Sequence, residues 1–430
     1  MSDGEAAVRE PIAGVQSDLD AENLGGWRFG RVVVAAGASV LGDRLLLALM
    51  AIYVTGVAGV EQVGLVLAAQ TVPFLVLVPA GGVWADRLSR AELARVCDLI
   101  RAATFAAVAV LTAAGAVGIA ELAGAMAVLG ACDAFSLPAF AGLVPELVLA
   151  PSQLRSGRAW MQAAEHTADV LGPAMASASL WLVGAPAGIA AASGMFAASA
   201  LLLTGLRSRV RATGSSGPDR GRWVDDFRRG VAAVSSRRWL WISLMSMASG
   251  ILLCQAPLFV LGPEVCRQVY GSATVFGAIL TALAVGGVLG AGLALRLAPR
   301  FPLRAGFALC AAWPVVAWAP ALHAPLPVVL VAALVSGTVL ALFAVYWTTT
   351  MAEQIPAELL SRVTSVYWFA ALLPLPIGML AAPAVAEAIS PRAALLVGGA
   401  LTTILLLCAL LEPAVRTLEA GPASVRAQRR

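Results

Sequence analysis

Residues 32–54 read VVVAAGASVLGDRLLLALMAIYV, an apolar run whose only charged residues are Asp43 and Arg44. An α-helix rises about 1.5 Å per residue, so a helix of this length crosses the roughly 30 Å hydrocarbon core of a bilayer. A strand of a membrane barrel would instead show about ten residues of alternating polarity, and this run does not alternate. The stretch therefore predicts a transmembrane helix with two charged side chains near its middle.

Runs of the same kind recur along the rest of the chain. Of its 430 residues, 60% are hydrophobic and 13% are charged, whereas soluble domains average about 25% charged residues. We therefore predict an all-α integral membrane protein with twelve transmembrane helices. The predicted spans are 32–54, 62–83, 99–118, 122–145, 161–183, 187–206, 240–262, 273–295, 304–321, 327–350, 364–386 and 393–411.

One long polar link divides the twelve spans into two six-helix halves. The link is rich in glycine, serine and arginine, a composition typical of connecting segments. We therefore expect five parts along the chain. These are a cytoplasmic N-terminal tail (1–31), an N-terminal six-helix half (32–206), a cytoplasmic central link (207–239), a C-terminal six-helix half (240–411) and a cytoplasmic C-terminal tail (412–430).

The orientation follows from arginine alone, because the chain has no lysine. With Arg101 counted at a span boundary, 26 of the 29 arginines fall in the tails, the link or the loops on one side of the membrane, and only Arg267 and Arg392 lie in opposite loops. Short loops rich in positive charge are poorly translocated, so we predict a plasma-membrane protein with both termini in the cytoplasm. The same rule explains why the central link is rich in arginine. We therefore expect the link to contact anionic lipid and expect no nucleic-acid partner.

Residues that would hold a metal or a cofactor are sparse. The six cysteines form no CxxC pair, and the two histidines, His166 and His323, are far apart in the sequence, so we expect neither a zinc site nor a disulfide framework. The sequence also lacks a GxxxxGK[ST] loop for ATP. We expect no cofactor, no metal and no enzymatic activity; a polytopic membrane enzyme and a receptor or channel subunit are the less favoured alternatives.

The segment 82–90, GVWADRLSR, lies between the second and third predicted spans. Gly82 permits close helix approach, and Asp86 can accept hydrogen bonds from a helix N-terminus or pair with Arg87 or Arg90. The string resembles the signature loop of the major facilitator superfamily, which implies a transporter fold with these four residues in a cytoplasmic gate. The alternative is an ordinary solvated loop with positive charges on the cytoplasmic side.

Further segments narrow the resemblance. DAFSLPAF (133–140), LVPEL (143–147) and IPAELLSRV (355–363) are similar to the exporter group that includes enterobactin exporters and macrolide efflux proteins. Gly172 and Pro173 are similar to a glycine–proline motif of drug/proton antiporters, in which the proline bends the helix. The resemblance implies an exporter of drugs or siderophores.

Ionisable residues inside the spans point to function independently of any family. A charge at mid-bilayer costs about 2.5 to 3.5 kcal/mol on insertion scales, so a retained one is a functional candidate. The candidates for proton coupling or substrate contact are Asp43, Arg44, Asp133, Glu165 and Asp169. Glu165 and Asp169 are one helical turn apart, and two such neighbours do not both ionise easily. The alternative is a static network in which Asp43, Arg44, Asp133 and Arg101 brace the first half.

The second half has few such charges and offers aromatic and polar residues instead. If the halves face each other across a central cavity, as the resemblance implies, this half provides an aromatic wall, which suits a small amphipathic molecule. The candidate cavity-lining residues are Gln255, Phe343, Tyr346, Trp347 and Thr348. Helix packing or an interfacial aromatic belt is the alternative for each ring.

Together these features predict a secondary active transporter that works by alternating access. We expect a monomer whose partners are a small-molecule substrate, protons and the lipid bilayer, and which exports an antibiotic, natural product or siderophore in exchange for protons. An uptake transporter of the same fold is the nearest alternative, since the residues alone do not fix the direction of transport.

Overall fold

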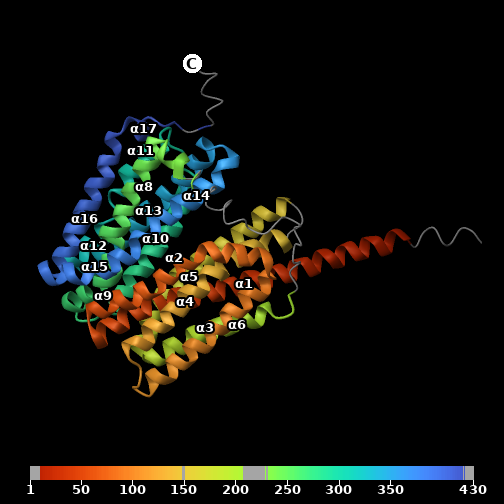
Figure 1. Ribbon diagram of the computed structural model, residues 1–430, viewed down its shortest axis with the longest axis horizontal. Helices are drawn as coiled ribbons and strands as arrows, with labels where there is room; N and C mark the ends of the chain where they lie inside the picture. The colour runs from red at the N-terminus through yellow and green to blue at the C-terminus, as the bar shows by residue number, and fades with distance from the viewer. Residues whose placement is uncertain (1–9, 148–150, 207–227, 229–230, 420, 422–430) are drawn as a thin grey trace, which may run out of the picture.

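The computed structural model describes residues 10–147, 151–206, 228, 231–419 and 421, and these residues form helices and turns without any strand. The first group of helices runs from red to yellow-green in Figure 1. It comprises α1 (Glu10–Ala58), α2 (Val60–Arg87), α3 (Arg90–Ala113), α4 (Ile119–Leu147), α5 (Pro151–Leu182) and α6 (Ala185–Leu203).

A second group, green to blue in Figure 1, follows the central link. It comprises α8 (Arg238–Gly250), the π-helical turn η1 (Ile251–Gln255), α9 (Ala256–Tyr270), α10 (Val275–Ala294), α11 (Pro302–Cys310), α12 (Val315–Ala321), α13 (Leu326–Gln354), α14 (Ala357–Leu372), α15 (Pro374–Ile389), α16 (Pro391–Cys408), the 3-10 turn η2 (Ala409–Leu411) and α17 (Pro413–Arg416).

Eleven segments of the described chain are long and apolar enough to cross a membrane. The remaining long helix, α5, contains polar residues such as Glu165, His166 and Asp169 that lower its hydropathy, and it packs between α1 and α10. The prediction of an all-helical membrane protein is therefore confirmed. Several spans differ in detail: α1 begins well before residue 32, and the eleventh span is interrupted at Leu373, where Pro374 cannot continue the hydrogen-bond ladder.

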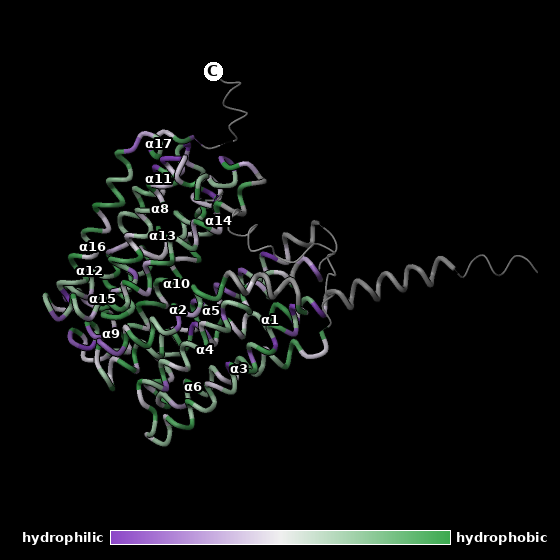
Figure 2. Tube along the Cα trace, in the orientation of Figure 1, coloured by the Kyte–Doolittle hydropathy of each residue, from purple (hydrophilic) through white to green (hydrophobic). Residues whose placement is uncertain are grey.

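The outer surface of both groups is apolar. Figure 2 shows hydrophobic residues along most of the helices, and several large side chains are strongly exposed, among them Leu201 (71%), Trp181 (78%) and Leu295 (89%). A water-soluble monomer rarely exposes contiguous apolar surface of this extent. The surface therefore suits contact with lipid chains.

The two groups meet at the end of the molecule that lies away from the start of α1 and from α17. There the Ser177 hydroxyl of α5 donates a 2.9 Å hydrogen bond to the carbonyl of Thr274, which precedes α10. A Cβ built on Gly64 of α2 would lie 2.4 Å from the carbonyl oxygen of Met379 on α15. Toward the opposite end, where α1 begins and α17 lies, the ribbons of the two groups diverge in Figure 1. The backbones of the two groups are therefore closest at the end that carries the Ser177–Thr274 contact.

Glycines set the close packing within each group. A Cβ on Gly130 of α4 would lie 1.8 Å from the carbonyl oxygen of Gln70 on α2, and one on Gly337 of α13 would lie 1.8 Å from that of Leu283 on α10. Such approaches are available only where the side chain is a hydrogen atom. The helix pairs α2–α4 and α10–α13 consequently pack backbone against backbone.

Gly130→Ala should therefore destabilise the protein by about 1–3 kcal/mol, because the added methyl group forces α2 and α4 apart. Gly124→Ala is the matched control, since it lies on the same helix and a Cβ there would meet nothing within 4 Å. The apparent melting temperature of the detergent-purified protein measures the difference. Equal melting temperatures for the two variants would show that α2 and α4 are not in backbone contact.

Candidate functional site

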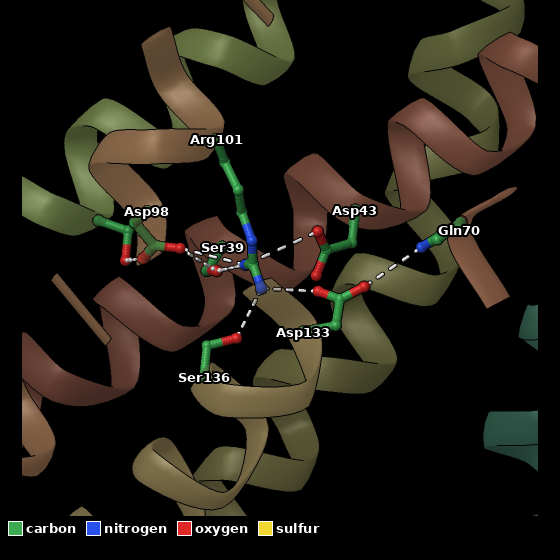
Figure 3. A network of polar contacts seen from close by, with 8 residues as sticks. Ser39, Asp43, Gln70, Asp98, Arg101, Asp133 and Ser136 are labelled. Atoms are coloured by element: carbon green, nitrogen blue, oxygen red, sulfur yellow. Dashed lines mark hydrogen bonds and ion pairs between the residues drawn. The ribbon is translucent and has the colours of Figure 1, made fainter. Parts of the chain in front are cut away.

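Arg101 of α3 lies at the centre of a buried polar network in the first group (Figure 3). Its side chain is buried, with 1% of its surface exposed. Nη1 donates to Ser39 Oγ of α1 at 3.0 Å and to Asp98 Oδ1 of α3 at 3.1 Å. Nη2 donates to two groups of α4, Asp133 Oδ1 at 2.7 Å and Ser136 Oγ at 2.6 Å. One guanidinium thus joins three helices.

Asp98 extends this network to α6. Its Oδ2 accepts a 2.6 Å hydrogen bond from the Ser199 hydroxyl, and its Oδ1 accepts one of 2.9 Å from the Ser39 hydroxyl. The ring of Phe196, also on α6, has its centroid 5.4 Å from the guanidinium carbon of Arg101, a distance that gives a favourable cation–π contact. Four of the six helices are therefore tied to one charge. We call the following residues the guanidinium cluster: Ser39, Asp43, Asp98, Arg101, Asp133, Ser136 and Ser199.

The guanidinium cluster holds more carboxylates than its single arginine can neutralise. Asp43 Oδ1 lies 3.8 Å from Arg101 Nη1, and this buried oxygen has no hydrogen-bond partner in the described part of the chain. Asp98 and Asp133, by contrast, each accept hydrogen bonds at both oxygens. Buried charge is costly unless it is paired and hydrogen-bonded. Asp43 is therefore the least satisfied carboxylate of the cluster.

Asp133 connects the guanidinium cluster to a cavity between the two groups of helices. The amide of Gln70 on α2 donates a 3.2 Å hydrogen bond to Asp133 Oδ2, and both residues line a cavity of about 770 Å³. The wall draws on α1, α2, α4 and α5 from the first group and on η1, α9, α10, α13, α14 and α15 from the second. This volume lies in the range of small-molecule sites.

A second polar group in the cavity joins α1 to α5. Arg44 Nε donates to Asp169 Oδ1 at 2.6 Å, and His166 Nδ1 lies 3.8 Å from Asp169 Oδ2. Close packing of α1 against α5 brings Arg44 and Asp169 together. A Cβ built on Gly172, one turn after Asp169, would lie 2.5 Å from Arg44 Cβ. The two charged side chains are 45% and 36% exposed, and all three line the cavity. A bound molecule can therefore touch them directly.

The structure brings together four of the five membrane-embedded residues that the sequence singled out. Asp43 and Asp133 belong to the guanidinium cluster, while Arg44 and Asp169 form the ion pair in the cavity. Glu165 is placed differently, because it is exposed and is not among the residues that line the cavity. Arg44 therefore pairs with α5 and is not part of the network that braces the first half.

The predicted lining residues of the second half divide into two sets. Gln255, at the end of η1, lies in the cavity wall. Phe343, Tyr346 and Trp347 are buried within the second group instead, and Thr348 is exposed with its hydroxyl donating to the backbone of its own helix. The expectation that these four residues of α13 line the cavity is thus corrected.

Helical periodicity explains this correction for the three aromatic residues, whereas Thr348 lies one turn beyond Ala344, the last residue of α13 in the wall. The face of α13 that lines the cavity is small and aliphatic, with Gly337, Leu340, Ala341 and Ala344. The aromatic residues lie on another face, where the Phe343 ring is 5.0 Å from that of Phe307 and the Trp347 ring is 4.5 Å from that of Tyr367, measured between centroids. The aromatic side chains that do line the cavity are Phe74, Phe259 and Trp368.

The structure describes the residues of the predicted gate loop and of the glycine–proline motif to different extents. Arg90 donates to the carbonyl of Gly142 at 2.8 Å and to Glu146 Oε1 at 2.9 Å, so it ties the start of α3 to the end of α4. The other three predicted gate residues, Gly82, Asp86 and Arg87, lie in the last part of α2, and their surroundings are outside what the structure describes. Pro173 lies inside α5, lines the cavity, and has its carbonyl 2.7 Å from a Cβ built on Gly277 of α10. The glycine–proline motif is therefore at the contact between the two groups.

Sequence reasoning missed Asp98, and it placed Arg101 at the cytoplasmic boundary. The structure corrects both placements, because α3 begins at Arg90 and carries these residues into the bundle. A predicted span that begins at residue 99 leaves Asp98 outside and Arg101 at its edge. The available signal was their spacing of three residues within an otherwise apolar stretch, which places two opposite charges on one helix face.

Arg101→Gln should lower stability by about 3–5 kcal/mol, because it leaves the carboxylates of the guanidinium cluster buried without their cation. Adding Asp98→Asn and Asp133→Asn should recover part of the loss by removing negative charge. Arg300→Gln is the control, since it breaks the exposed Arg300–Glu419 pair. Melting temperatures of the purified proteins decide: an Arg101 variant as stable as the control would refute the bracing role.

Comparisons with known proteins agree with this geometry. Residues 32–374 match the family model described as the Major Facilitator Superfamily. The chain is 27% identical over 371 residues to the multidrug efflux pump Tap of Mycolicibacterium fortuitum, an alignment that covers 82% of this chain and 87% of that protein.

Solved structures show the same fold at low sequence identity. The nucleoside transporter NupG matches with a TM-score of 0.71 and 13% identity, over 89% of this chain and 98% of that one. A bacterial homologue of the human lysosomal transporter Spinster, in an inward-facing and unoccupied conformation, matches with a TM-score of 0.69 and 13% identity, over 93% and 99% of the two chains. A D-xylose-proton symporter matches with a TM-score of 0.66 and 14% identity, over 91% and 99%. With its family match and its two groups of helices around one cavity, the chain belongs to the major facilitator superfamily and is a multi-pass membrane transporter.

Proposed function

We propose that this protein is a proton-coupled exporter of a small amphipathic organic molecule. The observation that carries the proposal is the cavity between the two helical groups, whose wall includes a carboxylate of the guanidinium cluster. A proton that binds to the cluster and a substrate that binds in the cavity would therefore act on side chains that contact each other, because Asp133 belongs to both. The same wall offers apolar and aromatic surface for the body of an organic molecule.

Alternating access would follow from rocking of the two groups about the cavity. The groups contact each other at the end away from α17 and diverge at the other end. With the termini in the cytoplasm, as the arginine distribution predicts, this arrangement would be an inward-facing state. A cytoplasmic molecule would enter the cavity from this side, in the cytoplasmic membrane, with the protein acting as a monomer.

Charge balance within the guanidinium cluster supports proton coupling. Asp43, Asp98 and Asp133 surround the single charge of Arg101, so binding of protons from outside reduces an uncompensated negative charge inside the membrane. Because the cluster joins α1, α3, α4 and α6, a change in its charge acts on several helices together. Asp43, with its unpartnered oxygen, and Asp133, at the cavity wall, are the carboxylates best placed to exchange the proton.

The direction of transport is the step that needs a functional measurement. Export is favoured by the similarity to a protein named as a multidrug efflux pump, at 27% identity. Uptake is the second candidate, because the same fold occurs in a D-xylose-proton symporter. The apolar and aromatic lining of the cavity favours an amphipathic molecule over a sugar.

Cells that express the protein should accumulate less of at least one compound from a panel of antibiotics, dyes and siderophores, and a protonophore should abolish the difference. Import into inverted vesicles on acidification of their interior checks the coupling directly, because protons then leave as substrate enters. Accumulation that rises with expression would establish uptake instead.

Asp43→Asn and Asp133→Asn should each lower proton-driven transport by at least about tenfold, since the charge that the proton neutralises is removed. Glu387→Gln, which alters an exposed carboxylate outside the cavity wall, should transport normally. Initial rates in vesicles with matched protein content provide the comparison. Wild-type rates for both aspartate variants would eliminate the coupling role.

A further inference from the structure

The Arg44–Asp169 pair in the cavity is held by a single hydrogen bond. Its contact is Arg44 Nε to Asp169 Oδ1 at 2.6 Å. Elsewhere in the protein Arg267 closes fully on Glu264, with Nε donating to Oε2 at 2.8 Å and Nη2 to Oε1 at 2.7 Å. That two-bond geometry is the usual one for an arginine–carboxylate pair. The cavity pair is therefore only half closed.

The half-closed geometry leaves hydrogen-bonding groups available on both partners. Among the described residues, neither terminal amino group of Arg44 has a hydrogen-bond acceptor, and Asp169 Oδ2 has only His166 Nδ1 at 3.8 Å. A guanidinium presents its free N–H groups as a planar fork that fits an acidic oxygen group. A carboxylate oxygen beside it accepts hydrogen bonds from a basic nitrogen. A donor fork and an acceptor thus lie next to each other in the wall.

The wall that the second group contributes has no ionisable side chain, among the described lining residues, that could pair with a charged ligand. Among the described lining residues, the second group contributes aliphatic and aromatic side chains together with the amide of Gln255. In the first group, Asp133 already accepts hydrogen bonds from Arg101 and Gln70. Arg44 and Asp169, with His166 beside them, are therefore the charged groups of the wall that a ligand can reach with free hydrogen-bonding capacity. Within this ion pair the two charges cancel, so a ligand that binds there with one charge leaves one member of the pair without a counter-charge, whereas a ligand with both charges leaves neither.

We propose that the Arg44–Asp169 pair binds the polar end of an amphoteric substrate, in which an acidic oxygen group and a basic nitrogen are close together. The acidic group accepts hydrogen bonds from the terminal amino groups of Arg44, and the protonated nitrogen donates to Asp169 Oδ2. The apolar body lies against Phe74, Phe259 and Trp368, which line the same cavity. This assignment rests on the proposed function and specifies the substrate class of that site.

Three probes with the same aromatic body test the assignment. They are 2-naphthylalanine, which is amphoteric at neutral pH, its methyl ester, which is a cation, and its N-acetyl derivative, which is an anion. Binding of each radiolabelled probe to the full chain in lipid nanodiscs is measured at about pH 6 with no gradient, because the amine of the ester is then protonated and the carboxylates of the other two probes are ionised. We expect the amphoteric probe to bind at least about tenfold more tightly than either analogue, since each analogue loses one charge-assisted hydrogen bond.

Variants locate this preference at the ion pair. Arg44→Gln should remove the advantage over the methyl ester, and Asp169→Asn should remove the advantage over the N-acetyl derivative. The exchange Arg44→Asp with Asp169→Arg keeps the net charge and should restore much of the preference if either single variant folds poorly. Arg300→Gln, which breaks an exposed ion pair of the second group, is the control and should bind like the wild type.

Several results would overturn the assignment. They are equal or tighter binding of either singly charged probe, no saturable binding of the amphoteric probe, or an unchanged preference in both single variants. The outcome is separable from that of the proposed function, because binding is measured without a gradient. Selective binding with no proton-driven flux would refute the exporter and leave the substrate class standing. Flux of other compounds without this selectivity would refute the substrate class alone.

Discussion

Arg101 is positioned where water cannot solvate its charge, and much of the first half is arranged around that constraint. A buried guanidinium is costly unless its charge is paired and hydrogen-bonded. Two serines and three aspartates of α1, α3 and α4 surround the two terminal amino groups of Arg101, while its Nε has no hydrogen-bond partner among the described residues. The packing of these helices and the protonation of their carboxylates are therefore physically linked, which is the property that a coupled transporter requires.

The two groups of helices differ in chemistry. Every ionisable residue in the described cavity wall comes from the first group, including Arg44 and Asp133. The second group contributes a wall that is apolar except for Gln255, and it uses its aromatic residues to pack α13 against its neighbours. The first group thus carries the charged side chains of the cavity, and the second provides most of its apolar surface.

Backbone contact between helices makes this division possible. Gly172 lets α1 and α5 approach closely enough for Arg44 to reach Asp169, and Gly130 does the same for α4 and α2, whose Gln70 reaches Asp133. In a bilayer the lipid chains are as apolar as leucine, so helices associate through close packing and hydrogen bonds. The small residues are therefore part of the polar site, although they contribute no polar side chain to it.

The sequence by itself determined the membrane class, the helical spans and the family, because the length of apolar runs and a loop motif are local properties of the chain. The bias of its arginines predicts the orientation. It also identified Asp43, Arg44, Asp133 and Asp169, since charges in apolar runs are visible without a fold. Only the tertiary structure decided which of these charges meet, that Arg101 is buried at their centre, and which face of α13 lines the cavity. Those outcomes depend on the rotation and depth of separate helices, and hydropathy, which locates a span to within a few residues, does not fix either one.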